Sequence, residues 1–322
     1  MTARTRAIFG GGENRTFPSL ASRAGGILGL TGTPLPNRPR EAFVLAKGMC
    51  PDAIDFMSED TFTGRFNPSM KMRNDDGKTF IDERSGHHGE LQSRLRANFM
   101  VRRVKHGPTG VLQQLKLPLY DIVHVESDGP IRAALRAESM LHIDLDHLPG
   151  PSDPIIGEIA TVRRLMGVAI APHAADYVEM LLLGGEDKIV VFGHHVQVLD
   201  IIEAKLGRFG VVRIDGSVAP GKKQILVDRF RDDPKVRVCL GNMLSMGTGT
   251  DGLQDVSSHA VFAEADWTPG VNQQGVDRLD RGGQLGQVQA DFLVAPGSFS
   301  EYVLSKAIEK NHNTDKALDR RM

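Results

Sequence analysis

The residues with the clearest chemical potential lie close together near the C-terminal end of the chain. Gln274, Arg278 and Arg281 recur at spacings that place both arginines on one helical face. A pair of arginines on one face is usually a solvated surface or part of an ion pair. The residue types alone therefore leave open whether these guanidinium groups bind an anion.

A glycine-rich segment precedes the arginines. Gly247 and Gly249 stand beside Asp251 in the run GTGTDG. Glycine lets the backbone approach a ligand closely, and exposed backbone amides in such a segment hold phosphate oxygens. The adjacent pair His194 and His195 is the other conspicuous group, but neighbouring side chains point to different sides, so we predict no metal site there.

Alternating short apolar runs and helical patterns predict the elements that position these residues. From about residue 154 onward, strands joined by helices indicate an α/β fold with a parallel sheet covered on both faces. Functional loops in such a fold follow the carboxyl ends of the strands, where the unusual residues of this chain lie. The predicted strands are Lys188–Phe192, Val211–Ile214, Val236–Leu240, Ala260–Phe262 and Ala290–Val294; the predicted helices are Val196–Leu206, Lys222–Phe230 and Tyr302–Glu309.

The first half of the chain is less regular. Gly, Pro, Asn and Asp are frequent from Gly64 to Gly89, which suggests loops or a hairpin, and Leu91–Lys105 is predicted to be a basic helix. The run PGPSDP at 149–154 is the best linker candidate. We therefore predict three parts, at residues 1–48, 49–150 and 151–322.

Composition sets broad limits on function. The chain has 322 residues, 40% of them apolar, and a formal net charge of -1, so a polyanion partner must be held by local patches. Cys50 and Cys239 lie far apart, which excludes a disulfide scaffold or a multi-cysteine zinc site and fits a reducing compartment. No apolar run approaches the length needed to cross a bilayer. We expect a cytoplasmic protein, in a bacterial or phage-type host, that does not associate with a membrane.

Four segments together resemble one protein family. They are LTGTPLPNRP at 30–39, FMVRRVKHGPTGVLQQL at 99–115, KIVVFGHHVQVLD at 188–200 with RIDGS at 213–217, and the run from Gly247 to Gln284 that contains DWTP and RLDRGGQ. The combination resembles the Snf-type branch of superfamily-two helicases, nearest the annealing helicases. The resemblance covers nearly the whole chain and implies the end of a first RecA-like lobe (1–48), a helical insertion and crossover (49–150), and a complete second RecA-like lobe (151–322).

The resemblance also implies roles for individual residues. Arg278 and Arg281 correspond to arginine fingers on the γ-phosphate of ATP, a role that suits the planar, permanently charged guanidinium group. The implied sites are catalytic Gln274, Arg278 and Arg281; ATP-binding Gly247, Gly249 and Asp251; and DNA-binding Thr31, Gly32, Thr33, Arg102, Arg103, Lys105, His194, Gly216 and Ser217.

The sequence departs from the family pattern beside the second finger. Asp280 stands where the family has His, and Gly282 stands where an apolar residue is usual. A carboxylate next to a finger is able to hold it away from phosphate, so we expect Asp280 to restrain Arg281. Thr250 and Asp251 also differ from the small or apolar residues that the family has there.

The phosphate-binding loop and the acidic box of such ATPases are not found in the sequence. Gly77-Lys78-Thr79 lacks the first glycine of the pattern, because residue 72 is Met72, and Asp82-Glu83 follows only a two-residue apolar run. We expect a separate polypeptide to supply the first lobe and the Mg²⁺ ligands, double-stranded or branched DNA to be the partner, and the chain alone to be inactive as an ATPase. The alternative is a non-catalytic nucleic-acid-binding remnant of such an enzyme.

Overall fold

The chain divides into two compact units. The computed structural model describes residues 8–9, 20–31, 34–35, 39–73, 79–83, 86–106, 110–141, 155–246, 250–266, 268–302 and 304–305. Unit 1 comprises Met1–Arg103 with Glu309–Met322, and unit 2 comprises Val104–Ile308. Gly32, Thr33, Gly247, Gly249 and the predicted linker at 149–154 lie outside the described residues.

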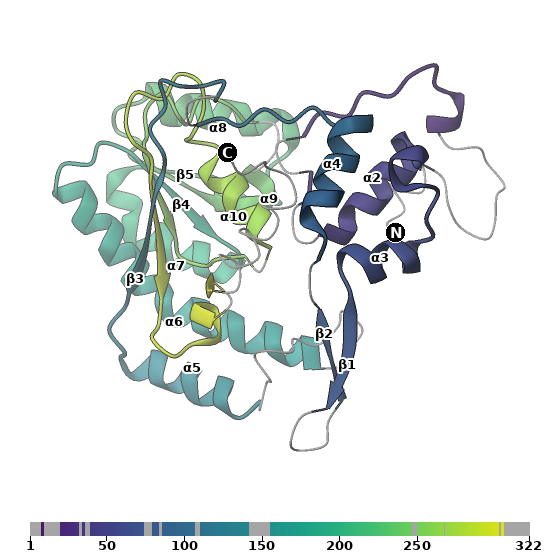
Figure 1. Ribbon diagram of the computed structural model, residues 1–322. Helices are drawn as coiled ribbons and strands as arrows, with labels where there is room; N and C mark the ends of the chain where they lie inside the picture. The colour runs from purple at the N-terminus through teal and green to yellow at the C-terminus, as the bar shows by residue number, and fades with distance from the viewer. Residues whose placement is uncertain are drawn as a thin grey trace. The chain divides into compact units, whose positions relative to one another are not determined.

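Unit 2 is built on a six-stranded sheet in which every neighbouring pair is parallel (Figure 1). The strand order is β3-β8-β7-β4-β6-β5. This confirms the predicted α/β class with a parallel sheet, and the predicted strands are present within one or two residues of their expected bounds. The strands are β3 (Leu119–His124), β4 (Ile189–Gly193), β5 (Val211–Ile214), β6 (Val238–Asn242), β7 (His259–Phe262) and β8 (Gln289–Val294).

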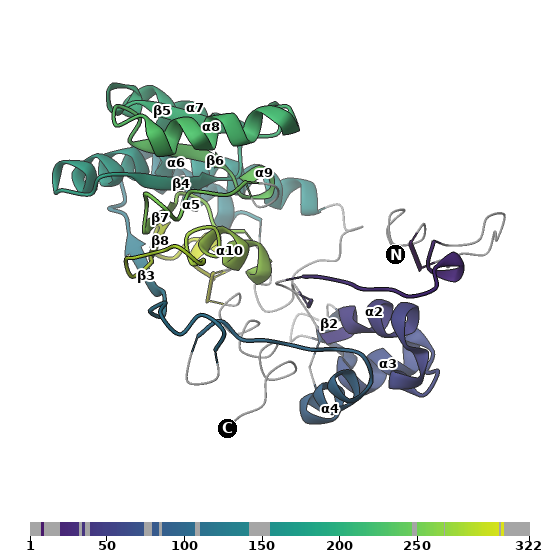
Figure 2. The same ribbon diagram turned by 90° about the horizontal axis from the view of Figure 1, so that it is seen from above.

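Side-chain alternation along the strands produces two cores, one on each face of the sheet. On β4, Ile189 and Val191 contribute to one core, whereas Val190 and Phe192 contribute to the other. The first core is closed by α5 (Gly129–Ser139), α6 (Ile155–Leu183) and α7 (Val196–Leu206); the second receives residues of α8 (Pro220–Asp232), α9 (Met243–Met246) and α10 (Pro269–Val276). Figure 2 shows the strands from β5 to β3 in the order given above. Central strands buried on both faces explain the unbroken apolar runs of the sequence.

The edge strand β3 and the long helix α6 were not predicted. β3 pairs with β8 along its full length, from Leu119 opposite Gln289 to His124 opposite Val294. Because this pairing brings residues upstream of 149–154 into the sheet, unit 2 begins at Val104, well ahead of the predicted linker. Helix α6 has Pro172 in its interior and is long and apolar enough, by composition, to cross a membrane, but half of its most apolar window is buried within the protein. It packs against α5 and α7 as a core helix.

Unit 1 has a small aromatic core and an antiparallel hairpin. Phe43, Phe62 and Phe66 pack together, with ring centroids 5.5 Å and 4.7 Å apart for the successive pairs, and Leu91 and Leu95 complete the cluster. Its elements are η1 (Ala21–Arg23), η2 (Pro39–Glu41), α2 (Ala42–Met49), η3 (Pro51–Ile54), α3 (Glu59–Phe66), α4 (His88–Asn98), and the paired strands β1 (Ser69–Arg73) and β2 (Thr79–Glu83). Thr79, Asp82 and Glu83 thus belong to a hairpin strand. The two sequence segments that contain them, Gly77-Lys78-Thr79 and Asp82-Glu83, are those that the sequence does not support as nucleotide-binding motifs.

Two local predictions in the first half are wrong. The basic helix ends at Asn98 rather than Lys105, because the Asn98 side chain donates to the Arg94 carbonyl at 2.7 Å and Phe99 leaves the helical conformation. The apolar run Gly26–Leu30, which its composition predicts to be a short strand before the turn at Thr31, is not a strand. Among the described residues it has no pairing partner, so Leu28 and Leu30 are 85% and 87% exposed. An isolated apolar run cannot satisfy a strand's hydrogen bonds by itself.

The turn between η4 (Gly207–Phe209) and β5 generates a stability prediction. Gly210 has φ of +70°, and an added Cβ would lie 2.0 Å from the Lys235 carbonyl oxygen, whereas a Cβ at nearby Gly207 meets nothing within 4 Å. We expect Gly210→Ala to lower the free energy of unfolding by about 1–3 kcal/mol, and Gly207→Ala to leave it nearly unchanged. Urea unfolding of the two variants measures the difference. Equal stabilities would contradict the strain at Gly210.

A buried ion pair generates a pH prediction. His259 Nε2 lies 2.6 Å from Asp291 Oδ2, which also accepts from Tyr177 Oη at 2.8 Å. Burial lowers the pKa of His259, but Asp291 and Glu186 outweigh it and raise this pKa above 6.5. Burial raises the pKa of Asp291, but hydrogen bonds from His259, Gln289 and Tyr177 outweigh it and lower this pKa below 3.8. The pair therefore stabilises the fold most between about pH 4 and 6.5.

We accordingly expect Asp291→Asn to cost about 3 kcal/mol of unfolding free energy near pH 5.5, because it leaves a buried imidazolium without its counter-ion. The cost shrinks as pH rises through the raised pKa of His259, where the imidazole becomes neutral. Chemical unfolding at pH 5.5 and 8.5 measures both values. The matched control is Asp176→Asn in the exposed Lys205–Asp176 pair, which should cost less than about 1 kcal/mol at either pH. A pH-independent cost at Asp291 would refute the linkage.

Candidate functional site

The candidate site lies where the loops following the carboxyl ends of the strands meet. After β6 the chain forms α9 and reaches Thr250 and Asp251; after β7 it passes Glu264 and enters α10. Parallel strands direct all of these loops to the same edge of the sheet, which is the edge where α/β proteins bind ligands. The sequence-predicted residues of unit 2 are therefore collected by topology, although they are far apart along the chain.

The two predicted fingers approach one short loop. Arg278 Nη1 donates to the Thr250 carbonyl oxygen at 3.1 Å, and Arg281 Nη1 pairs with Asp251 Oδ1 at 3.2 Å. The structure thus brings together Arg278, Arg281 and Asp251. Gln274 lies in α10 and is partly buried. The common feature is an arginine pair anchored on the segment that follows β6.

The prediction that both arginines lie on one face of a helix is wrong. Helix α10 ends at Val276, and both arginines belong to the turn that follows it, Asp277–Arg281, here called the arginine turn. Asp280 N donates four residues back, to Val276 O at 3.0 Å, but two other amides of the turn donate only three residues back: Arg278 N to Gly275 O at 3.2 Å and Leu279 N to Val276 O at 2.9 Å. This tighter winding sets side-chain directions differently from an α-helix. The arginines are brought together by this turn and by their contacts with the Thr250–Asp251 loop.

The electrostatics of the arginine pair favour an anion. Burial, followed by the nearby positive charge of Arg281, lowers the pKa of Arg278. Burial raises the pKa of Asp251, but hydrogen bonds from Gln254 and Arg281 outweigh it and lower that pKa. Two guanidinium groups that repel each other bind an oxyanion more strongly than either would alone, because the anion removes the repulsion as well as forming hydrogen bonds.

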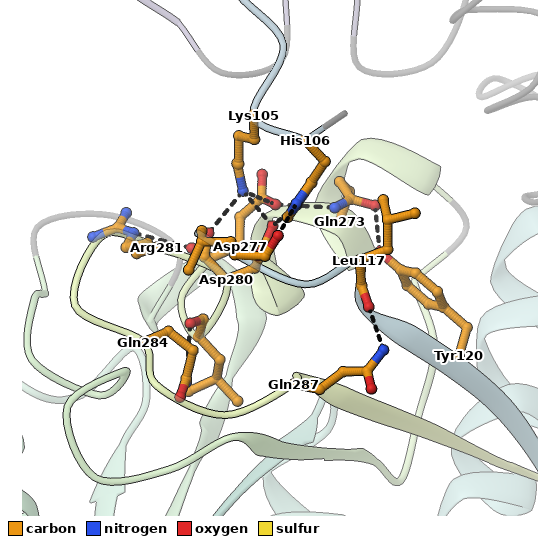
Figure 3. Close-up of polar contacts among 12 residues, drawn as sticks. Lys105, His106, Leu117, Tyr120, Gln273, Asp277, Asp280, Arg281, Gln284 and Gln287 are labelled. Atoms are coloured by element: carbon orange, nitrogen blue, oxygen red, sulfur yellow. Dashed lines mark hydrogen bonds and ion pairs between the residues drawn. The ribbon is translucent and has the colours of Figure 1, made fainter. Parts of the chain in front are cut away.

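Asp280 does not restrain Arg281, contrary to the expectation from the sequence. Its side chain is 2% exposed and faces the other way: Oδ2 accepts from Lys105 Nζ at 3.0 Å and from His106 Nε2 at 2.8 Å (Figure 3). The carboxylate that pairs with Arg281 is Asp251, which is 73% exposed. The turn explains the difference, because it directs the consecutive side chains of Asp280 and Arg281 to opposite sides.

Two basic residues of the segment Leu91–Lys105, Arg94 and Lys105, are engaged in ion pairs. Lys105 Nζ lies 2.6 Å from Asp277 Oδ1 and 3.0 Å from Asp280 Oδ2. In unit 1, Arg94 pairs with both Glu90 and Asp55. Arg102 is partly buried and Arg103 is exposed, both beyond the end of α4. Their DNA-contact role stays a prediction, with Arg103 the most accessible member of this group.

The DGS turn is held by its own aspartate. Asp215 Oδ1 accepts from the Ser217 amide at 2.9 Å and from its hydroxyl at 2.6 Å, while Arg213 Nε donates to Oδ2 at 2.8 Å. These bonds, led by that from the Ser217 hydroxyl, lower the pKa of Asp215. Gly216 and Ser217 are exposed, but the Ser217 hydroxyl donates inward. For a contact with phosphate, this hydroxyl would have to rotate away from Asp215.

Sequence reasoning missed Glu264, which organises the loop after β4. Its carboxylate accepts from the amides of His194 and His195, at 2.7 Å and 2.9 Å, and from His195 Nδ1 at 2.6 Å. Arg163 of α6 donates to the Ala265 carbonyl at 2.8 Å beside it. Burial, only partly opposed by nearby carboxylates, lowers the pKa of Arg163 to about 10. An acidic residue directly after a buried strand was the available signal.

His194 is oriented by this arrangement. Its ring lies edge-on to that of His195, with centroids 4.8 Å apart, and its carbonyl accepts from Asn242 Nδ2 at 2.9 Å. Burial, followed by the neighbouring charge of His195, lowers the pKa of His194. Within the described part of the chain, no group of three or more His, Cys, Asp or Glu side chains is arranged to hold a metal ion. Thr31 is exposed in unit 1.

Comparisons with known proteins support the motif assignments. No protein-family profile matches the chain. It is 28% identical over 318 residues to the Bos taurus "DNA annealing helicase and endonuclease ZRANB3", a match that covers 96% of this chain and 28% of that protein. It is 30% identical over 302 residues to the Xenopus laevis "SWI/SNF-related matrix-associated actin-dependent regulator of chromatin subfamily A-like protein 1", covering 88% of this chain and 29% of the relative. The chain thus spans less than a third of these relatives.

A solved structure supports the fold. The "C-terminal part of Fun30 ATPase domain" aligns with a TM-score of 0.50 and 15% identity, covering 64% of this chain and 98% of that one. At that identity the match speaks for the fold alone, and it agrees with the RecA-like lobe inferred from the motifs. The resemblance that the sequence motifs indicated is confirmed.

Proposed function

We propose that this chain, a homologue of Snf-type helicases, forms the second RecA-like lobe of a DNA-dependent ATPase that translocates on DNA and supplies its arginine fingers. The observation that carries the proposal is the approach of Arg278 and Arg281 to the Thr250–Asp251 loop at the carboxyl edge of the sheet. In this role the two guanidinium groups bind the γ-phosphate oxygens of ATP and stabilise the charge that develops during phosphoryl transfer.

The contact between Arg281 and Asp251 sets the resting position of one finger. Asp251 is 73% exposed and Arg281 33% exposed, so solvent screens the pair and it contributes at most about 1 kcal/mol. A triphosphate carries several negative charges and accepts two parallel hydrogen bonds from one guanidinium group. Phosphate therefore displaces Asp251 readily when ATP is presented, and Gln274 lies one helical turn before Arg278 to contact the nucleotide or its attacking water.

A partner polypeptide completes the proposed site. In this proposal the phosphate-binding loop and the Mg²⁺ ligands belong to a first lobe. Two features support such a partner: the segment ending in Thr31 resembles the end of a first lobe, and its Leu28 and Leu30 are almost fully exposed. A first-lobe sheet would cover these side chains, whose burial is favourable.

DNA is the proposed track of the enzyme. His194, Gly216 and Ser217 follow β4 and β5 in unit 2, and Thr31, Arg102 and Arg103 are the candidate contacts of unit 1. Backbone contacts of this kind bind phosphates without reading base sequence, and they weaken as salt increases. Closure of the lobes on ATP and their opening after hydrolysis would advance the protein along DNA.

Replacement of the fingers tests this function. In an assembly of the chain with a polypeptide that carries the phosphate-binding loop, we expect Arg278→Ala and Arg281→Ala each to lower kcat for DNA-stimulated ATP hydrolysis by about a thousandfold or more. Arg278→Lys should remain strongly impaired, because an ammonium group lacks the planar fork. Arg136→Ala, on the exposed side of α5, is the matched control and should leave kcat unchanged. Full activity of the double alanine variant would refute the assignment.

The chain by itself should not turn over ATP. Without a loop to cradle the phosphates, the arginines have no positioned substrate, so we expect no DNA-stimulated phosphate release from the purified chain and its appearance when the first-lobe polypeptide is added. Turnover by the chain alone would contradict this expectation. Salt-dependent DNA binding that ATP leaves unchanged, with no hydrolysis in the mixture, would instead favour the non-catalytic remnant.

A further inference from the structure

The buried face of the arginine turn is fastened to a separate segment of unit 2. This segment, here called the strap, consists of residues 104–106 and 110–117 and begins directly after Arg103, where unit 1 ends. Asp280 Oδ2 accepts from Lys105 and His106 of the strap. The other carboxylate oxygen, Oδ1, is buried and has no hydrogen-bond partner among the described residues. The side-chain hydrogen bonds of the buried Asp280 carboxylate are therefore those from the strap.

Lys105 binds the backbone of the arginine turn as well as the carboxylates of the turn. Its ammonium group donates to the Asp280 carbonyl oxygen at 2.9 Å, in addition to Asp277 Oδ1 at 2.6 Å. The backbone carbonyl oxygen of Asp277 accepts a hydrogen bond from Arg281 Nε at 3.0 Å. One lysine thus fixes the peptide unit immediately before Arg281 and the residue to which Arg281 is bonded. Figure 3 shows Lys105 and His106 reaching the turn from one side while Arg281 extends away from them.

The strap itself is held in a fixed conformation. Val111 N donates to Val104 O and Leu112 N to Lys105 O, both at 3.0 Å. Gly110 lies so close to this bridge that an added Cβ would come within 2.4 Å of the Lys105 carbonyl oxygen. Leu115 is 7% exposed, and its carbonyl oxygen lies 3.4 Å from His106 Nδ1. The ammonium group of Lys105 is therefore presented by a closed, packed turn.

Further hydrogen bonds connect the arginine turn and the strap to the sheet. Gln273 of α10 donates from Nε2 to Asp277 Oδ1 at 2.9 Å, and its Oε1 accepts from Tyr120 Oη of β3 at 3.0 Å. Farther along, Gln287 Nε2 donates to the Leu117 carbonyl oxygen of the strap at 2.9 Å. The arginine turn is consequently connected on its buried side to the strap, to α10 and to the edge strand, through polar contacts with defined direction.

We propose that Asp280 and Asp277 are positioning residues, which use Lys105 and His106 to lock the arginine turn onto the strap and so keep Arg278 and Arg281 aimed at the nucleotide. The inference rests on the proposed function for its catalytic consequence, but the lock itself is a property of unit 2. The strap follows Arg103 of unit 1 directly in the chain. The carboxylate at Asp280, where related proteins have His by the resemblance above, is what makes this attachment ionic.

The lock gives Lys105 a different role from the DNA contact that the sequence suggests, and the two make opposite predictions. If Lys105 only binds DNA phosphate, its replacement lowers DNA affinity and the salt dependence of binding, and replacement of Asp277 has no effect on either. If Lys105 positions the arginine turn, its replacement leaves DNA affinity unchanged and has the same effect on the turn as replacement of Asp277. Two residues that act through one contact are non-additive in a double-mutant cycle.

Hydrogen exchange of the purified full chain tests the lock without any ATPase activity. Lys105→Met keeps the length of the side chain and removes its charge. We expect this variant and Asp280→Asn to accelerate amide exchange in the strap and in the arginine turn, and Lys105→Arg to restore protection. The matched control, Lys205→Met, breaks the exposed Lys205–Asp176 pair and should leave exchange at these segments unchanged. Unchanged exchange in Lys105→Met would overturn the proposal.

Steady-state kinetics of the two-polypeptide assembly, with ATP and duplex DNA, test the catalytic consequence. We expect Lys105→Met and Asp277→Asn each to lower kcat by about tenfold to a hundredfold, because a small misplacement of catalytic groups has effects of this size. KM for ATP should change by less than about twofold, and the double variant should be no worse than either single one. Wild-type kcat in both single variants, or reduced DNA affinity in Lys105→Met alone, would overturn the proposal.

The outcomes separate the lock from the proposed function. If exchange responds as expected but Arg278→Ala and Arg281→Ala leave ATP hydrolysis intact, the lock stands and the finger assignment fails. If the arginine variants abolish hydrolysis but the lysine and aspartate variants change neither exchange nor kcat, the finger assignment stands and the lock is wrong.

Discussion

The parallel arrangement of the sheet is the constraint on which the candidate chemistry depends. Every neighbouring pair of strands is parallel, so the loops after β4, β5, β6 and β7 emerge at one edge. The arginine turn, the Thr250–Asp251 loop, the DGS turn and Glu264 are thereby gathered without being close in sequence. The sheet remains rigid because side chains alternate between two cores, each closed by helices. A rigid edge is what allows guanidinium groups on a short turn to be aimed.

Most of the sheet could be predicted because central strands bury both faces and therefore read as unbroken apolar runs. The edge strand β3 could not, because nearly all of its residues are exposed and its pairing with β8 is a contact between distant parts of the chain. Helix α6 escaped prediction for a related reason. It is packed by α5, α7 and the sheet, so its apolar residues follow no single stripe, and Pro172 interrupts the helical pattern.

The candidate site shows the same division between what local sequence carries and what tertiary contacts decide. Arg278 and Arg281 were selected as candidates by their type, their spacing and the family resemblance of their segment. Their partners could not be predicted in this way, because the direction of each side chain depends on a turn tighter than an α-helix. Asp280, adjacent to Arg281 in sequence, pairs with Lys105, 175 residues away, whereas Asp251 pairs with Arg281 across 30 residues. Adjacency in sequence is a poor guide to ion pairing at the end of a helix.

Charge pairing also changes what the basic segments can do. Nearly equal numbers of acidic and basic residues give a net charge of -1, and the structure shows many of them used internally: Lys105 by Asp277 and Asp280, Arg94 by Glu90 and Asp55. A phosphate contact requires a cation that can leave its partner at little cost. An exposed pair such as Arg281–Asp251 meets that condition, since screening makes it weak, whereas Lys105 beside the buried carboxylate of Asp280 does not. The burial of the acidic partner, more than the number of basic residues, therefore decides which cations are available to a phosphate and which hold the arginine turn in place.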